Sequence, residues 1–130
     1  MRFVDTSFWI GFTIPRDRRH GDAVALWRHR APLRTSNLVL GETWTWLRSR
    51  VGYAAALSFR ELASQSPSLS IAVVDASIDA RAWEWLHRHD ERVYSYVDAT
   101  SFEIMRRERI TEALAFDGDF SAAGFVEVRP

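Results

Sequence analysis

The stretch LSIAVVD, residues 69–75, is a short and almost continuously apolar run with three β-branched side chains. A run of this length and composition predicts a β-strand, and its nearly uniform apolar character predicts that both faces of the strand are covered. Strands of this kind occur mainly in parallel sheets that have helices on both sides. Residues 69–75 therefore favour an α/β fold.

Helical patterns separate this run from other strand-like segments. We expect further short strands at 3–4, 33–36, 112–117 and 125–129. We expect helices at about 6–14, 22–30, 37–51, 53–63, 78–89 and 98–107, several of them ended by proline or glycine. Because strands alternate with helices, the sequence predicts a three-layer α/β/α sandwich around a central, mainly parallel sheet. No repeat or linker interrupts the pattern, so we expect one domain over residues 1–130.

Composition limits the chemistry and the compartment. The chain has no cysteine and no apolar run as long as a membrane span, which favours a soluble cytoplasmic protein without a membrane partner. Seventeen acidic residues balance seventeen basic ones, so net charge does not point to nucleic acid. Every basic residue is an arginine. The absence of lysine excludes haloacid dehalogenase phosphatases and response-regulator receivers, which both need one.

Acidic residues follow several of the predicted strands. Asp5 ends the first strand, Asp98 opens the helix after YSYV, and Asp117 and Asp119 follow ALAF. In an open parallel sheet, ligands bind beyond the carboxyl ends of the strands, so these acids are expected at one edge. Each acid taken alone could instead cap a helix or form a turn, as in DTS, DATS and Asp117-Gly118.

Glu42 is harder to explain as a structural residue. It lies in LVLGETWTWL, residues 38–47, among apolar and aromatic side chains, and no basic residue is placed to pair with it. A desolvated carboxylate is costly, so it is normally paired, protonated, hydrogen-bonded to a buried hydroxyl, or bound to a metal. Glu42 could reach the same edge of the sheet as the aspartates.

Several carboxylates gathered without basic partners repel one another, and a hard divalent cation such as Mg²⁺ or Mn²⁺ relieves this repulsion. Such a centre can hydrolyse phosphodiesters by activating water and by neutralising charge on the leaving oxygen. Hydroxyl groups beside the acids could bind a phosphate or cap helices; these belong to Thr6, Ser7, Thr100 and Ser101. Three arginines after the first helix are candidates for a phosphate clamp or for an ordinary solvated loop; these are Arg16, Arg18 and Arg19.

Four motifs in order resemble the PIN-domain ribonucleases, and specifically the VapC toxins of bacterial toxin–antitoxin pairs. They are FVDTSFW at 3–9, GET at 41–43, YVDATSF at 96–102 and AFDGDF at 115–120 with a later GF. The resemblance spans the whole chain. It implies a parallel sheet flanked by helices, homodimerisation, inhibition by a VapB-like antitoxin, and endonuclease activity that depends on Mg²⁺ or Mn²⁺.

The resemblance also implies roles for individual residues. Four acids would be catalytic and would bind the metal: Asp5, Glu42, Asp98 and Asp117. Asp119 would join them, as a ligand or as a group that orients one. The RNA substrate would be structured, either a tRNA or the sarcin–ricin loop of 23S rRNA, and GETWTWL and AFDGDFSAAGFVEVRP are similar to the ribosomal-RNA branch.

Two alternatives to this reading stay open from the sequence. RAWEWLH, residues 81–87, matches the Arg-x5-His pattern of HEPN toxins, which cut RNA without a metal. Those proteins are helical, whereas this chain has several predicted strands. The other alternative is a PIN-like binding module that keeps its acids but has no catalytic activity.

Overall fold

The computed structural model describes residues 1–29 and 31–130. Within them, five strands form one sheet in the order β3-β2-β1-β4-β5, and all four pairings are parallel. The strands are β1 (Arg2–Val4), β2 (Leu33–Ser36), β3 (Leu69–Ala72), β4 (Glu112–Leu114) and β5 (Val126–Glu127). The parallel α/β sandwich predicted from the sequence is confirmed.

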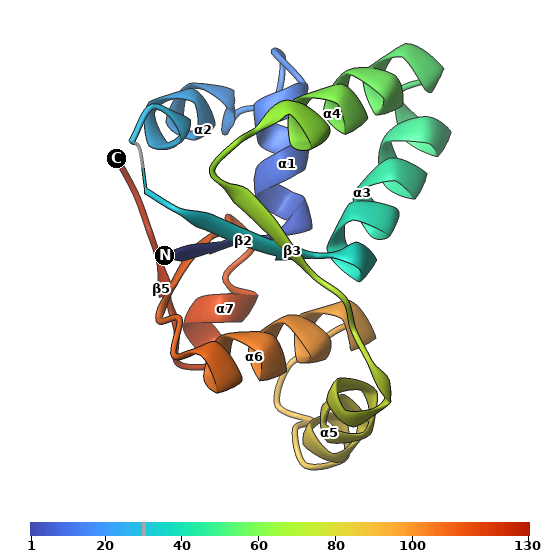
Figure 1. Cartoon of the computed structure of the whole chain (residues 1–130), viewed down its shortest axis with the longest axis vertical. Helices are drawn as coiled ribbons and strands as arrows, with labels where there is room; N and C mark the ends of the chain where they lie inside the picture. The colour runs from blue at the N-terminus through green and yellow to red at the C-terminus, as the bar shows by residue number, and fades with distance from the viewer. Residues whose placement is uncertain (30) are drawn as a thin grey trace.

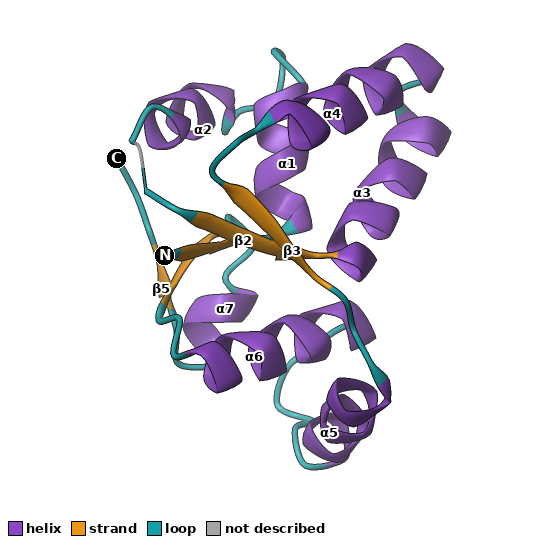
Figure 2. Cartoon of the chain, viewed as in Figure 1, coloured by secondary structure: helices purple, strands orange, loops and turns teal. Residues whose placement is uncertain are grey.

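Helices cover both faces of the sheet, as Figure 1 shows. One layer consists of α1 (Thr6–Thr13), α2 (His20–Trp27), α3 (Asn37–Arg50) and α4 (Tyr53–Gln65). The other consists of α5 (Ala76–His87), α6 (Tyr96–Glu108) and the single turn α7 (Asp119–Ala122). Figure 2 shows the strands as a thin layer between the two sets of helices. Large side chains that are fully buried on either side of this layer include Trp9, Phe59, Phe102 and Phe120.

Side-chain caps explain where the site-bearing helices begin. The Asp5 carboxylate accepts a hydrogen bond from the Ser7 backbone at the start of α1, and Ser36 does the same for α3. Ser95 and Asp98 form a reciprocal capping box. Consequently α6 begins at Tyr96, two residues before the predicted start, and Asp98 lies inside its first turn.

Two further predictions need correction, and one element was not predicted. The strand predicted at 69–75 ends at Ala72 and is not covered on both faces, because Ile71 is 43% exposed; β3 also lies at an edge of the sheet. The predicted helix 22–30 ends at Trp27; its last predicted residue, Arg30, lies outside the described residues. The turn α7 was not predicted, because four residues after a glycine carry no periodic pattern.

No helix in the described part of the chain is long and apolar enough to cross a membrane.

Candidate metal centre

All five acids singled out from the sequence line one pocket of about 300 Å³. The remaining lining residues are Thr6, Ser7, Ile10, Trp46, Val93 and Ser95. The pocket lies beyond the carboxyl ends of β1 and β4, because Asp5 directly follows β1 and Asp117 follows β4 by three residues. The topology therefore brings together residues that are up to 114 positions apart, from 5 to 119.

Asp5 is buried and held by Ser7. Both the backbone N–H and the hydroxyl of Ser7 donate to Asp5 Oδ2, at 3.1 and 2.7 Å. The same hydroxyl accepts a hydrogen bond from the Phe116 N–H at 2.9 Å. Ser7 therefore links Asp5 to the segment that leads into Asp117. The single proton of the Ser7 hydroxyl is used within the protein.

Asp98 and Asp117 are oriented by nearby backbone groups. Asp98 accepts from the Ser95 N–H at 3.0 Å, as part of the capping box. Asp117 accepts from the Asp119 N–H at 3.1 Å across a turn whose central residue, Gly118, has a φ of +84°. One carboxylate oxygen from each of Asp98, Asp117 and Asp119 lies within 4.8 Å of the other two.

Glu127, which the sequence analysis missed, also holds the turn at 117–119 in place through hydrogen bonds to its backbone. Its side chain is only 2% exposed and accepts hydrogen bonds from the N–H groups of Gly118 at 3.2 Å and Ser121 at 2.9 Å. These contacts satisfy the backbone at the start of α7, where no side-chain cap is present. Glu127 therefore fixes the backbone that positions Asp117 and Asp119.

Burial, together with the neighbouring charges, raises the pKa values of three of the acids, Asp5, Asp98 and Asp117. Burial raises the pKa of Asp5 from 3.8 to about 8, and the neighbouring charge of Asp117 adds to the effect. Burial, followed by the charges of Asp119 and Asp117, raises the pKa of Asp98 to about 7. Burial likewise raises the pKa of Asp117 to about 6, with further contributions from Asp119 and Glu127.

These shifts provide a test of whether a cation fits the pocket. Desolvation and the neighbouring negative charges both disfavour the ionised forms of Asp5, Asp98 and Asp117, and a hard divalent cation relieves both effects. Mg²⁺ binds oxygen ligands at roughly 2.1 Å, so two opposing ligands lie about 4.2 Å apart. The oxygens of Asp98, Asp117 and Asp119 lie within 4.8 Å of one another, and Asp5 lines the same pocket. The carboxylate set therefore fits a divalent cation.

Glu42 reaches the pocket from α3. The fully buried side of this helix carries Val39, Thr43 and Leu47, and Glu42 lies beside that side, half-buried and facing the acids. No ion pair to Glu42 exists among the described residues. The carboxylate therefore faces the pocket and is not enclosed in the apolar core.

Arg92 is a basic residue at the pocket that the sequence analysis missed. Its Nε donates to Asp119 Oδ1 at 2.6 Å and its Nη2 donates to the Asp117 carbonyl at 3.0 Å. The sequence could have indicated Arg92 as a pocket neighbour, because it lies shortly before YSYVD, the segment that leads to the same edge of the sheet. Asp119 is thus paired with an arginine, in contrast to Asp5, Asp98 and Asp117.

The predicted hydroxyl contacts divide into two groups. Thr6 and Ser7 line the pocket, although Thr6 is largely buried and donates weakly to the Val39 carbonyl at 3.5 Å. Ser101 and Thr100 are fully buried and donate back to the Val97 carbonyl at 2.9 and 2.8 Å. Ser101 is therefore buried and does not line the pocket, and its contact with the substrate stays a prediction that this position does not support.

The three predicted clamp arginines lie in and beside the segment between α1 and α2. The Arg19 guanidinium carbon lies 5.4 Å from the centroid of the Phe116 ring. Phe116 is the residue directly before Asp117 in the chain. Its ion pair with Asp22 is long, at 3.8 Å. Arg16 and Arg18 are exposed to solvent. Arg19 is therefore the member of the group that lies next to the acidic segment.

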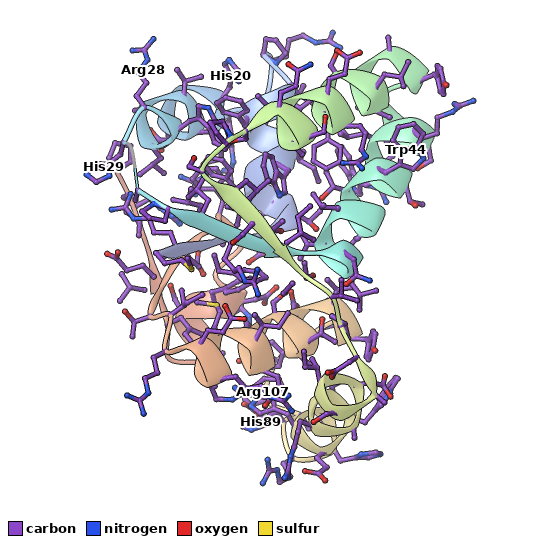
Figure 3. The ribbon with its side chains drawn as sticks, viewed as in Figure 1. His20, Arg28, His29, Trp44, His89 and Arg107 are labelled. Carbon is purple, nitrogen blue, oxygen red and sulfur yellow. The ribbon has the colours of Figure 1, made fainter. Side chains whose placement is uncertain are left out.

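The histidines lie elsewhere, as Figure 3 shows for three of them. His20 and His29 flank α2, and His89 follows α5. The His20 ring contacts the Gly11 carbonyl at 3.0 Å and the His89 ring contacts Glu91 at 2.9 Å. None of these three residues lines the acidic pocket.

The sequence matches a known protein family and two characterised relatives. The model of the family described as the PIN domain matches residues 2–126. The 23S rRNA-specific endonuclease VapC20 of Mycobacterium tuberculosis is 55% identical over 131 residues, which cover 100% of this chain and 99% of that protein. A VapC ribonuclease of Archaeoglobus fulgidus is 31% identical over 124 residues, covering 91% of this chain and 78% of that protein.

Comparison of structures agrees. The crystal structure of M. tuberculosis VapC20, described as a sarcin–ricin loop cleaving toxin, superposes with a TM-score of 0.95 at 54% identity, covering 100% of both chains. The structure of FitAcB from Neisseria gonorrhoeae superposes with a TM-score of 0.70 at 17% identity, covering 97% of this chain and 95% of that one, and shows a shared fold.

Proposed function

The chain belongs to the PIN-domain family, and from this premise we propose that it is an endoribonuclease toxin that uses a divalent cation to cleave the sarcin–ricin loop of 23S rRNA. The resemblance predicted from the four motifs is thereby confirmed. The observation that carries the proposal is the gathering of five carboxylates in one pocket. This pocket lies in a chain that is 55% identical, end to end, to a 23S rRNA-specific endonuclease.

In this proposal Asp5, Asp98 and Asp117 hold the cation, with Glu42 on the facing wall of the pocket. A bound Mg²⁺ or Mn²⁺ would supply an activated water and neutralise charge that develops on the phosphate. The protein contributes a preorganised set of oxygens, fixed by Ser7, Ser95 and the turn at Gly118. With pKa values of about 8 and about 7, Asp5 keeps most of its proton and Asp98 part of its proton near neutral pH until a cation displaces them, whereas Asp117, with a pKa of about 6, is mostly ionised.

The test is cleavage of a synthetic sarcin–ricin hairpin, with a tRNA as the comparison substrate. We expect cleavage of the hairpin in Mg²⁺ and none in EDTA, and we expect Asp98→Asn and Glu42→Gln to abolish it. Asp75→Asn is the matched control, because Asp75 caps α5 away from the pocket and asparagine also caps helices. Full cleavage by both pocket variants, or in EDTA, would reject the metal-centre assignment, whereas cleavage of only the tRNA would reject the ribosomal substrate.

The two alternatives are separated by the same assay. The HEPN pattern places Arg81 and His87 on the exposed side of α5, where Arg81 pairs with Glu84 at 2.9 Å, and neither residue lines the acidic pocket. A cleavage reaction that survives EDTA and is lost in His87→Ala would favour that mechanism. A protein that binds the hairpin without cutting it under any of these conditions would be a non-catalytic module.

We further propose a cytoplasmic location, a VapB-like antitoxin as inhibitor, and a homodimer formed through the face of α3, α4 and β3. This face contains a groove of about 590 Å³. The groove is lined by Asn37, Leu40, Gly41, Trp44, Leu57, Arg60 and Ile71. Trp44 lies on the outer side of α3 (Figure 3). An apolar groove beside an edge strand is a typical site of association.

The dimer is tested by light scattering on the purified protein. We expect Leu57→Arg to convert a dimer into a monomer, because the substitution places a charge in the groove. Val126→Arg is the matched control, since Val126 is also exposed but lies on β5 at the opposite edge of the sheet. A monomeric wild-type protein, or a Leu57→Arg variant that stays dimeric, would refute this interface.

A further inference from the structure

Arg92 lies beside the acidic pocket, where it contacts the lining residue Asp119, and the proposed catalytic role does not use it. Its fork of N–H donors spans two parts of the same turn, the Asp119 carboxylate at 2.6 Å and the Asp117 carbonyl at 3.0 Å. Among the described residues it is the only arginine paired with any of the five acids that line the pocket. One positive charge therefore lies directly against the turn that carries Asp117 and Asp119.

The guanidinium is seated closely against the turn. A Cβ atom at Gly118 would lie 3.0 Å from Arg92 Nη2, so the absence of a side chain at position 118 lets the guanidinium reach the backbone. The Asp119 side chain is 17% exposed and the Arg92 side chain is 41% exposed. A two-point, partly buried contact of this kind holds its geometry better than an ordinary surface ion pair.

We propose that Arg92 takes the place of a second cation: its guanidinium neutralises Asp119 and withholds it from metal coordination, so that the pocket binds one divalent ion. This inference rests on the proposed cation site. A second ion beside Asp119 would have to displace Arg92 or lie next to its positive charge, and like charges at such short range repel strongly. The remaining acids, Asp5, Asp98 and Asp117, carry no such counter-charge and are left for the single ion.

The experiment measures Mn²⁺ stoichiometry and affinity by electron paramagnetic resonance at pH 8, without RNA. We expect wild-type protein to bind one Mn²⁺. Arg92→Gln should bind a second, and its first Mn²⁺ should bind about tenfold more tightly because a nearby positive charge is gone. The double variant Arg92→Gln with Asp119→Asn should return to one Mn²⁺, since it lacks both members of the pair.

Arg88→Gln is the control for net charge. Arg88 is exposed, lies four residues before Arg92, and forms no ion pair within the described part of the chain. We expect this variant to bind Mn²⁺ as the wild type does, and circular dichroism should show every variant folded. Equal increases in Mn²⁺ affinity and stoichiometry in Arg92→Gln and Arg88→Gln would overturn the inference. An Arg92→Gln variant that binds Mn²⁺ as the wild type does, or more weakly, would also overturn it.

The outcomes for the wild-type protein separate the inference from the proposed function. Two Mn²⁺ ions bound to the wild type would overturn the role of Arg92 and leave the metal-dependent nuclease intact. No bound Mn²⁺ would reject the cation site itself and, with it, both proposals.

Discussion

Replacing Asp5 by asparagine should stabilise the metal-free protein at alkaline pH while removing its capacity to bind a cation. Asp5 is buried, and its pKa is raised from 3.8 to about 8 by desolvation and by the charge of Asp117. A tenfold change in a proton equilibrium corresponds to about 1.4 kcal/mol, so this difference corresponds to roughly 6 kcal/mol of unfavourable free energy in the ionised folded state. Asparagine has nearly the same shape, and its carbonyl can still accept from Ser7, as an N-cap residue must.

The sign of the pH dependence follows from the direction of the shift. The folded state holds the Asp5 proton more tightly than the unfolded state, so the penalty is absent below pH 4, grows between pH 4 and 8, and is complete above pH 8. The raised pKa already includes the hydrogen bonds from Ser7. Because an asparagine amide fits the site less well than a protonated carboxyl group, a net stabilisation of about 3 kcal/mol is expected, which is roughly 10 °C in melting temperature for a chain of this size.

The assay is thermal unfolding followed by circular dichroism in EDTA at pH 5 and at pH 8.5. Asp5→Asn should melt well above the wild type at pH 8.5 and only slightly above it at pH 5, and added Mg²⁺ should raise the melting temperature of the wild type alone. Asp75→Asn is again the control, because Asp75 caps α5 without crowded acids around it. If Asp5→Asn melts at or below the wild-type temperature at pH 8.5 in EDTA, the electrostatic reasoning about the pocket is wrong.

Three further predictions concern the same region. In EDTA, the wild-type protein should lose stability from pH 5 to pH 8.5, because Asp98 and Asp117 also have raised pKa values. Mg²⁺ should raise the melting temperature more at pH 8.5 than at pH 5. A calorimetric melting temperature that does not change with pH would contradict this. Ser101→Ala should cleave RNA at the wild-type rate in a gel assay, because its hydroxyl is buried. Arg19→Gln should weaken RNA binding severalfold and lower the salt dependence measured by fluorescence anisotropy, whereas Arg28→Gln, exposed at the end of α2, should not.

Local patterns in the sequence were sufficient to predict most of the elements. Apolar periodicity and helix-ending residues located six helices, and Ser36 and Asp5 occur where caps are observed. Such signals work because a helix or a cap depends on residues only a few positions apart. The α6 start was misplaced by two residues because both Ser95 and Asp98 are good cap residues, and only the observed capping box shows which of them begins the helix.

The candidate site was predictable as a set of acids but not as an arrangement. Asp5, Asp98 and Asp117 follow strands or open helices, and a parallel sheet places such positions at one edge. Their roles as metal ligands stay a prediction. The supporting contacts were not visible in the sequence: Arg92 to Asp119 spans 27 positions, and Phe116 to Ser7 spans 109.

By itself, then, the sequence determined which segments are helical or extended, that the sheet is parallel, and which carboxylates approach its active edge. Only the tertiary structure decided that β3 lies at the margin with Ile71 exposed, that Ser101 points inward, and that Asp119 shares its charge with Arg92. The physical reason is the range of the interactions. Secondary structure and capping depend on neighbours along the chain, whereas strand order, burial and ion pairing depend on which distant surfaces pack together.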